Sequence, residues 1–68
     1  MDNRITIREA LTEALVKNEK LDPADTIEVL RASVVRLRMI LGDHGIDNLI
    51  DPNDARTIAE QQLALFLI

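Results

Sequence analysis

The residues of this chain whose types could carry chemistry gather first around its single histidine. His44 lies between Asp43 and Gly45, and Asp47 and Asp51 follow. An imidazole beside carboxylates is common in acid–base catalysis and in metal binding. The sequence has no second histidine and no cysteine to complete a transition-metal site, and the aspartates lack the spacing of a calcium-binding EF-hand loop. We interpret the segment as a polar loop and expect neither a metal nor a cofactor.

Two pairs of carboxylates are the other candidates for chemistry, Asp22 with Asp25 and Asp51 with Asp54. Paired carboxylates act in glycoside hydrolysis. Each pair, however, brackets a proline in the pattern apolar-Asp-Pro-x-Asp, which is typical of a helix start. The first aspartate accepts a free backbone N–H, and proline lacks the N–H that would remain unpaired. A chain this short also leaves little room for a water-excluding cleft. We therefore expect a protein that is not an enzyme.

These starts predict an all-α fold, a small three-helix bundle in one domain of residues 1–68. Before the first helix, Thr6 and Glu9 have the spacing of a capping box, and Gly42 can end the second helix. The connection that follows should contain a short helical turn that brings Ile46 and Leu49 back onto the core, together with Ile50. The three helices are expected at about residues 7–20, 24–41 and 52–67.

Composition predicts that the bundle is completed by a second chain. The chain has 68 residues, 47% of them hydrophobic, with no cysteine and one aromatic residue. A domain of this size has a marginal core and usually needs disulfides, a metal or a partner. Because the sequence has no cysteine and only one histidine, disulfides and a metal site are not expected, and association with a second chain remains.

Charge and hydropathy limit the cell compartment and the kinds of binding partner that we expect for this protein. The net charge of −4 disfavours non-specific attraction to nucleic acid and to anionic membranes. No apolar run approaches the roughly 20 residues of a membrane span, and the first residues lack the apolar stretch of a secretory signal. We expect a cytoplasmic protein without a membrane partner.

The predicted helix 24–41 is apolar on two sides. A heptad seam runs along one side, and a second strip of Ala32, Val35 and Met39 occupies another, with Arg31 and Arg38 between them. A helix that is apolar on two sides normally has neighbours on both. The seam comprises Ile27, Leu30, Val34, Leu37 and Leu41.

The chain end is apolar on all sides of its helix, so one intramolecular face cannot cover it. An exposed patch of this kind marks an interface, and a twofold homodimer is the simplest solution. The expected dimer or partner interface comprises Leu37, Leu41, Leu63, Leu65, Phe66, Leu67 and Ile68. A second partner face comprises Arg31, Val35, Arg38 and Met39.

Two classes of function remain. The favoured one is a dimeric helical module for protein–protein interaction that acts as a small regulator, inhibitor or adaptor of a larger protein. Its composition is similar to that of small acidic proteins common among phage and accessory bacterial genes. The alternative resembles the small Rop-type helical dimer of plasmid copy control, with nucleic acid bound through the arginines of helix 24–41.

Overall fold

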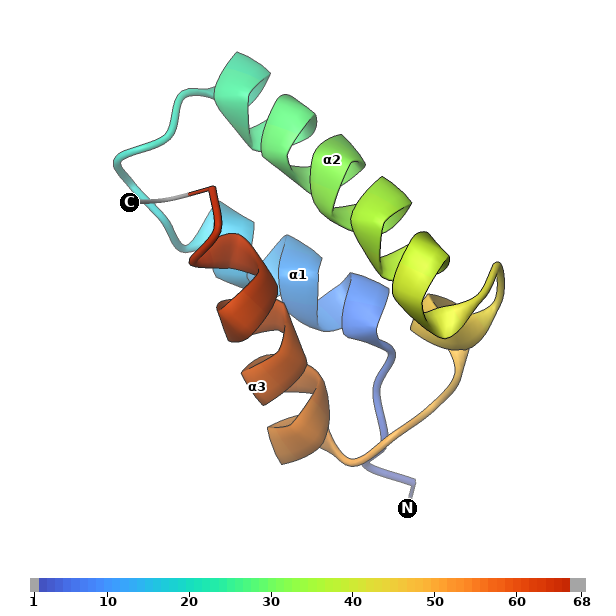
Figure 1. Ribbon diagram of the computed structural model, residues 1–68. Helices are drawn as coiled ribbons and strands as arrows, with labels where there is room; N and C mark the ends of the chain where they lie inside the picture. Colours follow the sequence, from blue (N-terminus) through green and yellow to red (C-terminus); the bar gives the residue numbers. More distant parts are fainter. Residues whose placement is uncertain (1, 67–68) are drawn as a thin grey trace.

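The computed structural model describes residues 2–66 and shows three α-helices (Figure 1). They are α1 (Ile7–Val16), α2 (Pro23–Leu41) and α3 (Pro52–Leu63), and one 3₁₀ turn, η1 (Gly45–Asp47), lies between α2 and α3. The predicted all-α class, the number of helices and the short turn after Gly42 are confirmed.

All three helices begin within one residue of the predicted start, and each has a side-chain cap. The hydroxyl of Thr6 accepts a hydrogen bond from the backbone N–H of Glu9 at 3.0 Å. Asp22 accepts from the N–H of Asp25 at 2.9 Å. Asp51 accepts from the N–H groups of the second and third residues after it, at 2.8 and 3.4 Å. Two of the four candidate catalytic carboxylates therefore cap helices.

Two helices end earlier than expected. α1 stops at Val16 instead of residue 20, because Asn18 turns the chain: its side chain accepts from the N–H of Lys20 at 3.0 Å. α3 stops at Leu63 instead of residue 67, and Leu65 and Phe66 donate to carbonyls three residues back, which tightens the chain into a turn.

Gly42 ends α2 as predicted. Its N–H donates to the carbonyl of Arg38 at 2.9 Å, and its φ of +86° with ψ of 170° lies in a region open essentially to glycine alone.

The core lies mainly between α1 and α3. These two helices make the most extensive contact in the fold, and α2 meets α3 least (Figure 1). α2 and η1 close the core from the other side with Leu37 and Ile46. The buried apolar residues are Ile7, Ala10, Leu11, Leu15, Val34, Leu37, Ile46, Ala55, Ala59 and Leu63.

The connection between α2 and α3 packs in part as expected. Ile46 is fully buried and Ile50 half-buried, which confirms two predictions, but Leu49 is 51% exposed and its predicted packing is wrong. The structure adds a backbone bridge, in which Ile5 and Ile50 exchange two hydrogen bonds of 2.9 Å. This bridge fixes the connection against the start of the chain.

Candidate functional site

The segment around His44 forms no metal site in the described part of the chain, where no cluster of three His, Cys, Asp or Glu side chains is found. Asp47 pairs instead with Arg8: Nε donates to Oδ1 at 2.9 Å and Nη2 to Oδ2 at 3.4 Å. These hydrogen bonds lower the pKa of Asp47 and raise that of Arg8. The pair ties α1 to η1, so it has a structural explanation.

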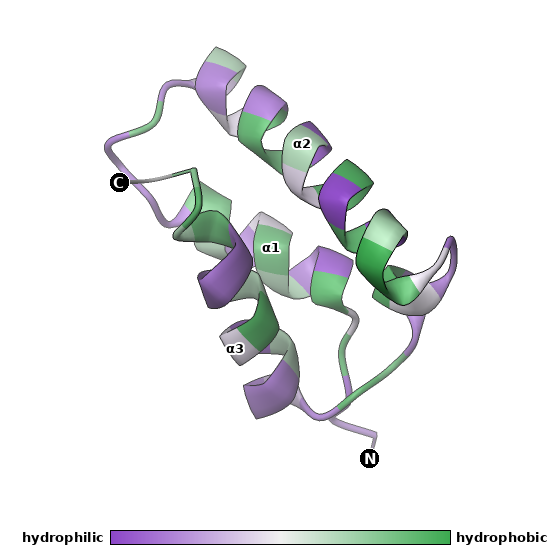
Figure 2. Cartoon of the chain, viewed as in Figure 1, coloured by the Kyte–Doolittle hydropathy of each residue, from purple (hydrophilic) through white to green (hydrophobic). Residues whose placement is uncertain are grey.

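Among the described residues, α2 carries more of the exposed large apolar side chains than any other element. Met39 is 84% exposed, and Ile40 is 62% exposed. Hydrophobic residues recur in successive turns of α2, as the green bands of Figure 2 show. The exposed large apolar residues of α2 are Ile27, Val35, Met39, Ile40 and Leu41. The prediction that this helix is apolar on two sides is consistent with that distribution.

A first hollow, which we call the outer groove, follows the side of α2 opposite the core. Its volume is about 470 Å³. Phe66, from the turn after α3, completes it, so it joins a residue predicted for the dimer interface to three predicted for the second face. The lining residues are Glu28, Arg31, Ala32, Val35, Arg36, Met39 and Phe66.

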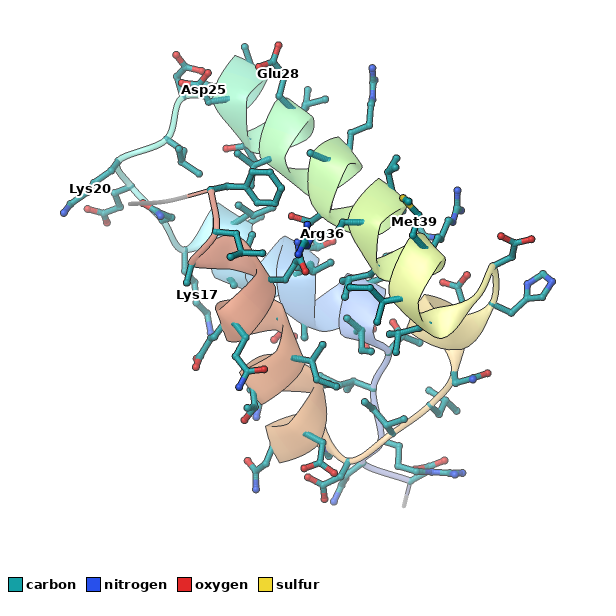
Figure 3. All side chains as sticks on the ribbon, viewed as in Figure 1. Lys17, Lys20, Asp25, Glu28, Arg36 and Met39 are labelled. Carbon is teal, nitrogen blue, oxygen red and sulfur yellow. The ribbon has the colours of Figure 1, made fainter. Side chains whose placement is uncertain are left out.

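A second hollow, the inter-helix groove, lies between α2 and α3 and has a volume of about 330 Å³. Arg36 borders both grooves, and its side chain extends from α2 into the space beside α3 (Figure 3). The lining residues are Arg36, Leu37, Ile40, Leu41, Ile58, Gln61, Gln62 and Leu65.

Gln62 is the polar residue of this groove that sequence reasoning missed. It is 5% exposed, and its Nε2 has no hydrogen-bond partner among the described residues. Ser33, fully buried on α2, also leaves its hydroxyl unpaired there. A buried donor without a partner is costly. The helical spacing of Gln62 from Ala55 and Ala59 was the available signal that it faces inward.

The arginines of α2 are exposed. Within residues 2–66, Arg31, Arg36 and Arg38 form no salt bridge. Arg31 and Arg38 also border a third apolar hollow, of about 350 Å³, beside Ile27. Their guanidinium groups are therefore available to a partner of opposite charge.

The structure divides the predicted dimer interface into three parts. Leu37 and Leu63 are 4% and 5% exposed and belong to the core of the single chain. Leu41, Leu65 and Phe66 are exposed and border the grooves. The last two predicted residues, Leu67 and Ile68, lie outside the described residues. In the second predicted face, Arg31, Val35, Arg38 and Met39 are all exposed.

No helix among the described residues is both long and apolar enough to span a membrane. Comparison of the chain with protein-family models, with curated protein sequences and with solved structures finds no match in any of the three. The surface of α2 is therefore the basis for a functional proposal.

Proposed function

We propose that this protein is a non-enzymatic helical interaction module that forms a homodimer and binds a larger protein as a regulator, inhibitor or adaptor. One observation carries the proposal: apolar side chains line two adjoining grooves on α2 although the chain already has a closed core. A single chain gains nothing from leaving these side chains in water.

The energy available from covering them is large for so small a protein. Burial of apolar surface contributes about 25 cal/mol per Å², so three or four such side chains contribute several kcal/mol. That is comparable with the entire stability of a small domain. The proposed dimer would gain this energy from side chains such as Met39 and Phe66, which the core does not use.

Two grooves allow two occupants. Arg36 borders both grooves. Gln62 lines the inter-helix groove, and its Nε2 is buried without a hydrogen-bond partner among the described residues. A larger protein that inserts aliphatic side chains together with a carboxylate oxygen would pair with the exposed guanidinium group of Arg36. This supports a division in which one groove serves self-association and the other recognises the partner.

Sedimentation velocity of the wild type and of the double variant Leu65→Asp with Phe66→Asp tests the proposal. We expect a wild-type dimer at a chain concentration of about 100 μM and a folded monomer for the double variant, since both residues lie outside the closed core. Thr57→Asp, on an exposed position of α3 that borders neither groove, is the control and should remain dimeric. A wild type that sediments as a monomer at all concentrations contradicts the proposed self-association.

The unpaired arginines of α2 support the Rop-like alternative. Phosphate contacts weaken steeply with salt, whereas aliphatic contacts do not. We would titrate a labelled RNA duplex into the wild type and into Arg31→Ala with Arg38→Ala at two salt concentrations. Tight, salt-sensitive binding that the double variant loses would favour nucleic-acid binding over the module. The net charge of −4 and the scarcity of aromatic residues for base stacking lead us to expect no such binding.

A further inference from the structure

The outer groove has the residue spacing of a helix-pairing seam. Glu28, Ala32, Val35 and Met39 follow one another at steps of four, three and four residues, which places them on one stripe of α2. The opposite side of the helix carries Ser33 and Leu37, which are buried in the chain's own core. The stripe therefore faces away from the core, and Phe66 is the one residue outside α2 that borders it among the described residues.

The charges of α2 are segregated along its length. The three acidic residues, Asp22, Asp25 and Glu28, occupy its N-cap and first half, and the three arginines, Arg31, Arg36 and Arg38, follow. Figure 3 shows Glu28 and Met39 toward opposite ends of the helix. Such a helix is complementary to a copy of itself only when the copy runs in the opposite direction.

Resting on the proposed self-association, we propose that a second copy covers the outer groove and that the two α2 helices pair antiparallel about a twofold axis. Glu28 of each copy then lies beside Arg36 and Arg38 of the other. The opposite arrangement, with parallel helices, places Glu28 against Glu28 and Arg31 near Arg36, so it brings like charges together.

The antiparallel register follows from the stripe. Glu28 lies opposite Met39 of the second copy, and Ala32 lies opposite Val35, so each small or charged residue meets a large apolar one. All three apolar residues of the stripe are covered, and Ala32 permits close approach of the helices. Arg31 comes within a turn of Arg38 of the second copy, but both lie at the edge of the contact, where water screens them.

Phe66 extends the contact beyond the two helices. It lines the same groove from the turn after α3 and is 41% exposed. A single pair of helices buries an area at the low end for a specific interface. We therefore expect a dissociation constant of about micromolar order. The inter-helix groove, with Gln62, stays open for the larger protein.

Disulfide trapping tests the direction of the helices, because the sequence contains no cysteine that would interfere. We would mix Glu28→Cys and Met39→Cys in equal amounts, oxidise the mixture and weigh the products by mass spectrometry. An antiparallel pair brings positions 28 and 39 together, while like positions are separated by about 16 Å along the axis, beyond the reach of a disulfide. The mixed disulfide should dominate, and Thr57→Cys, on the exposed side of α3, gives the level of random collision.

The outcomes separate this inference from the proposal on which it rests. Disulfides between two copies of the same variant, in a sample that sediments as a dimer, would overturn the antiparallel arrangement. Self-association itself would not be contradicted. A monomeric sample with yields no higher than that of Thr57→Cys would overturn both.

Charge variants provide an independent readout. Glu28→Arg alone should weaken the dimer by about fivefold, because two interchain pairs are lost. Arg38→Glu alone should weaken it less, because its contacts with Arg31 of the second copy become attractive. An equimolar mixture of the two variants should recover heterodimers of wild-type affinity. Failure of the mixture to recover affinity would contradict the proposed pairing.

Discussion

At the scale of single residues, the carboxylates that could have carried chemistry serve the fold instead. Asp22 and Asp51 accept the free N–H groups of α2 and α3, and Asp47 holds Arg8. The two caps could be predicted because their partners lie within three residues in the chain. The pairing of Asp47 with Arg8 joins residues 39 apart and depends on how α1 and η1 dock, so local pattern could not predict it.

The pair of Arg8 and Asp47 makes stability depend on pH. Hydrogen bonds from Arg8 hold the pKa of Asp47 below its ordinary value, so the folded state favours the ionised carboxylate. A lowered pKa gives stability that is present above the ordinary value, near 3.9, and is lost as the pH falls through the folded-state pKa. Arg8 stays protonated throughout this range. Urea unfolding should therefore show a greater loss between pH 6 and pH 3 for the wild type than for Asp47→Asn.

Comparing the wild type with Asp47→Asn separates the contribution of Asp47 from that of Asp2, whose pKa is also lowered. Hydrogen bonds from Arg4 lower the pKa of Asp2 to about 2, and Asp2 is present in both proteins. Both side chains of the Arg8–Asp47 pair are more than 40% exposed, so added salt should reduce the difference. Equal losses in the two proteins would show that Asp47 contributes nothing to folding.

At the scale of elements, the helix starts were predictable, but of the helix ends only that of α2, at Gly42, was. A start depends on a cap such as Thr6, which acts through the next few residues. α1 ends early because Asn18 closes a turn on itself, although the apolar periodicity continues to Leu21 and suggested a longer helix. Periodicity reports which side faces the core and does not report whether the backbone between two apolar residues is helical.

The connection between α2 and α3 offers a matched pair of substitutions. Ile46 is fully buried, whereas Leu49 is 51% exposed in the same short segment. Ile46→Ala should lower the free energy of unfolding by about 2–4 kcal/mol, through lost burial and the cavity left behind. Leu49→Ala should change it by less than about 0.5 kcal/mol. Chemical denaturation of both variants measures the difference, and equal effects would mean that Leu49 packs against the protein in solution.

At the scale of the whole molecule, the sequence revealed an excess of apolar surface without revealing which residues form it. Leu37 and Leu63 were expected at an interface, but α1, α2 and α3 bury both within one chain. Met39 and Phe66 remain outside. Which apolar residues become the core is decided by how the helices pack on one another, and that information is not local.

Self-association links thermal stability to protein concentration. If the folded chain is a dimer, each tenfold increase in concentration stabilises it by about 1.4 kcal/mol per dimer. For two domains of this size, the midpoint temperature should rise by about 3–6 °C. Calorimetry over two decades of concentration measures the shift, and the variant Leu65→Asp with Phe66→Asp should show none. A wild-type midpoint that stays constant would contradict a folded dimer.

The helices do not pack in the order in which they are joined. α1 contacts α3 more extensively than it contacts its neighbour α2, and the bridge from Ile5 to Ile50 closes most of the chain into a ring. Closing a long loop costs entropy before its contacts can compensate, and helical proteins fold fastest when their contacts are local. The slow step in folding should therefore be the docking of α3 on α1, because this contact joins the two ends of the chain.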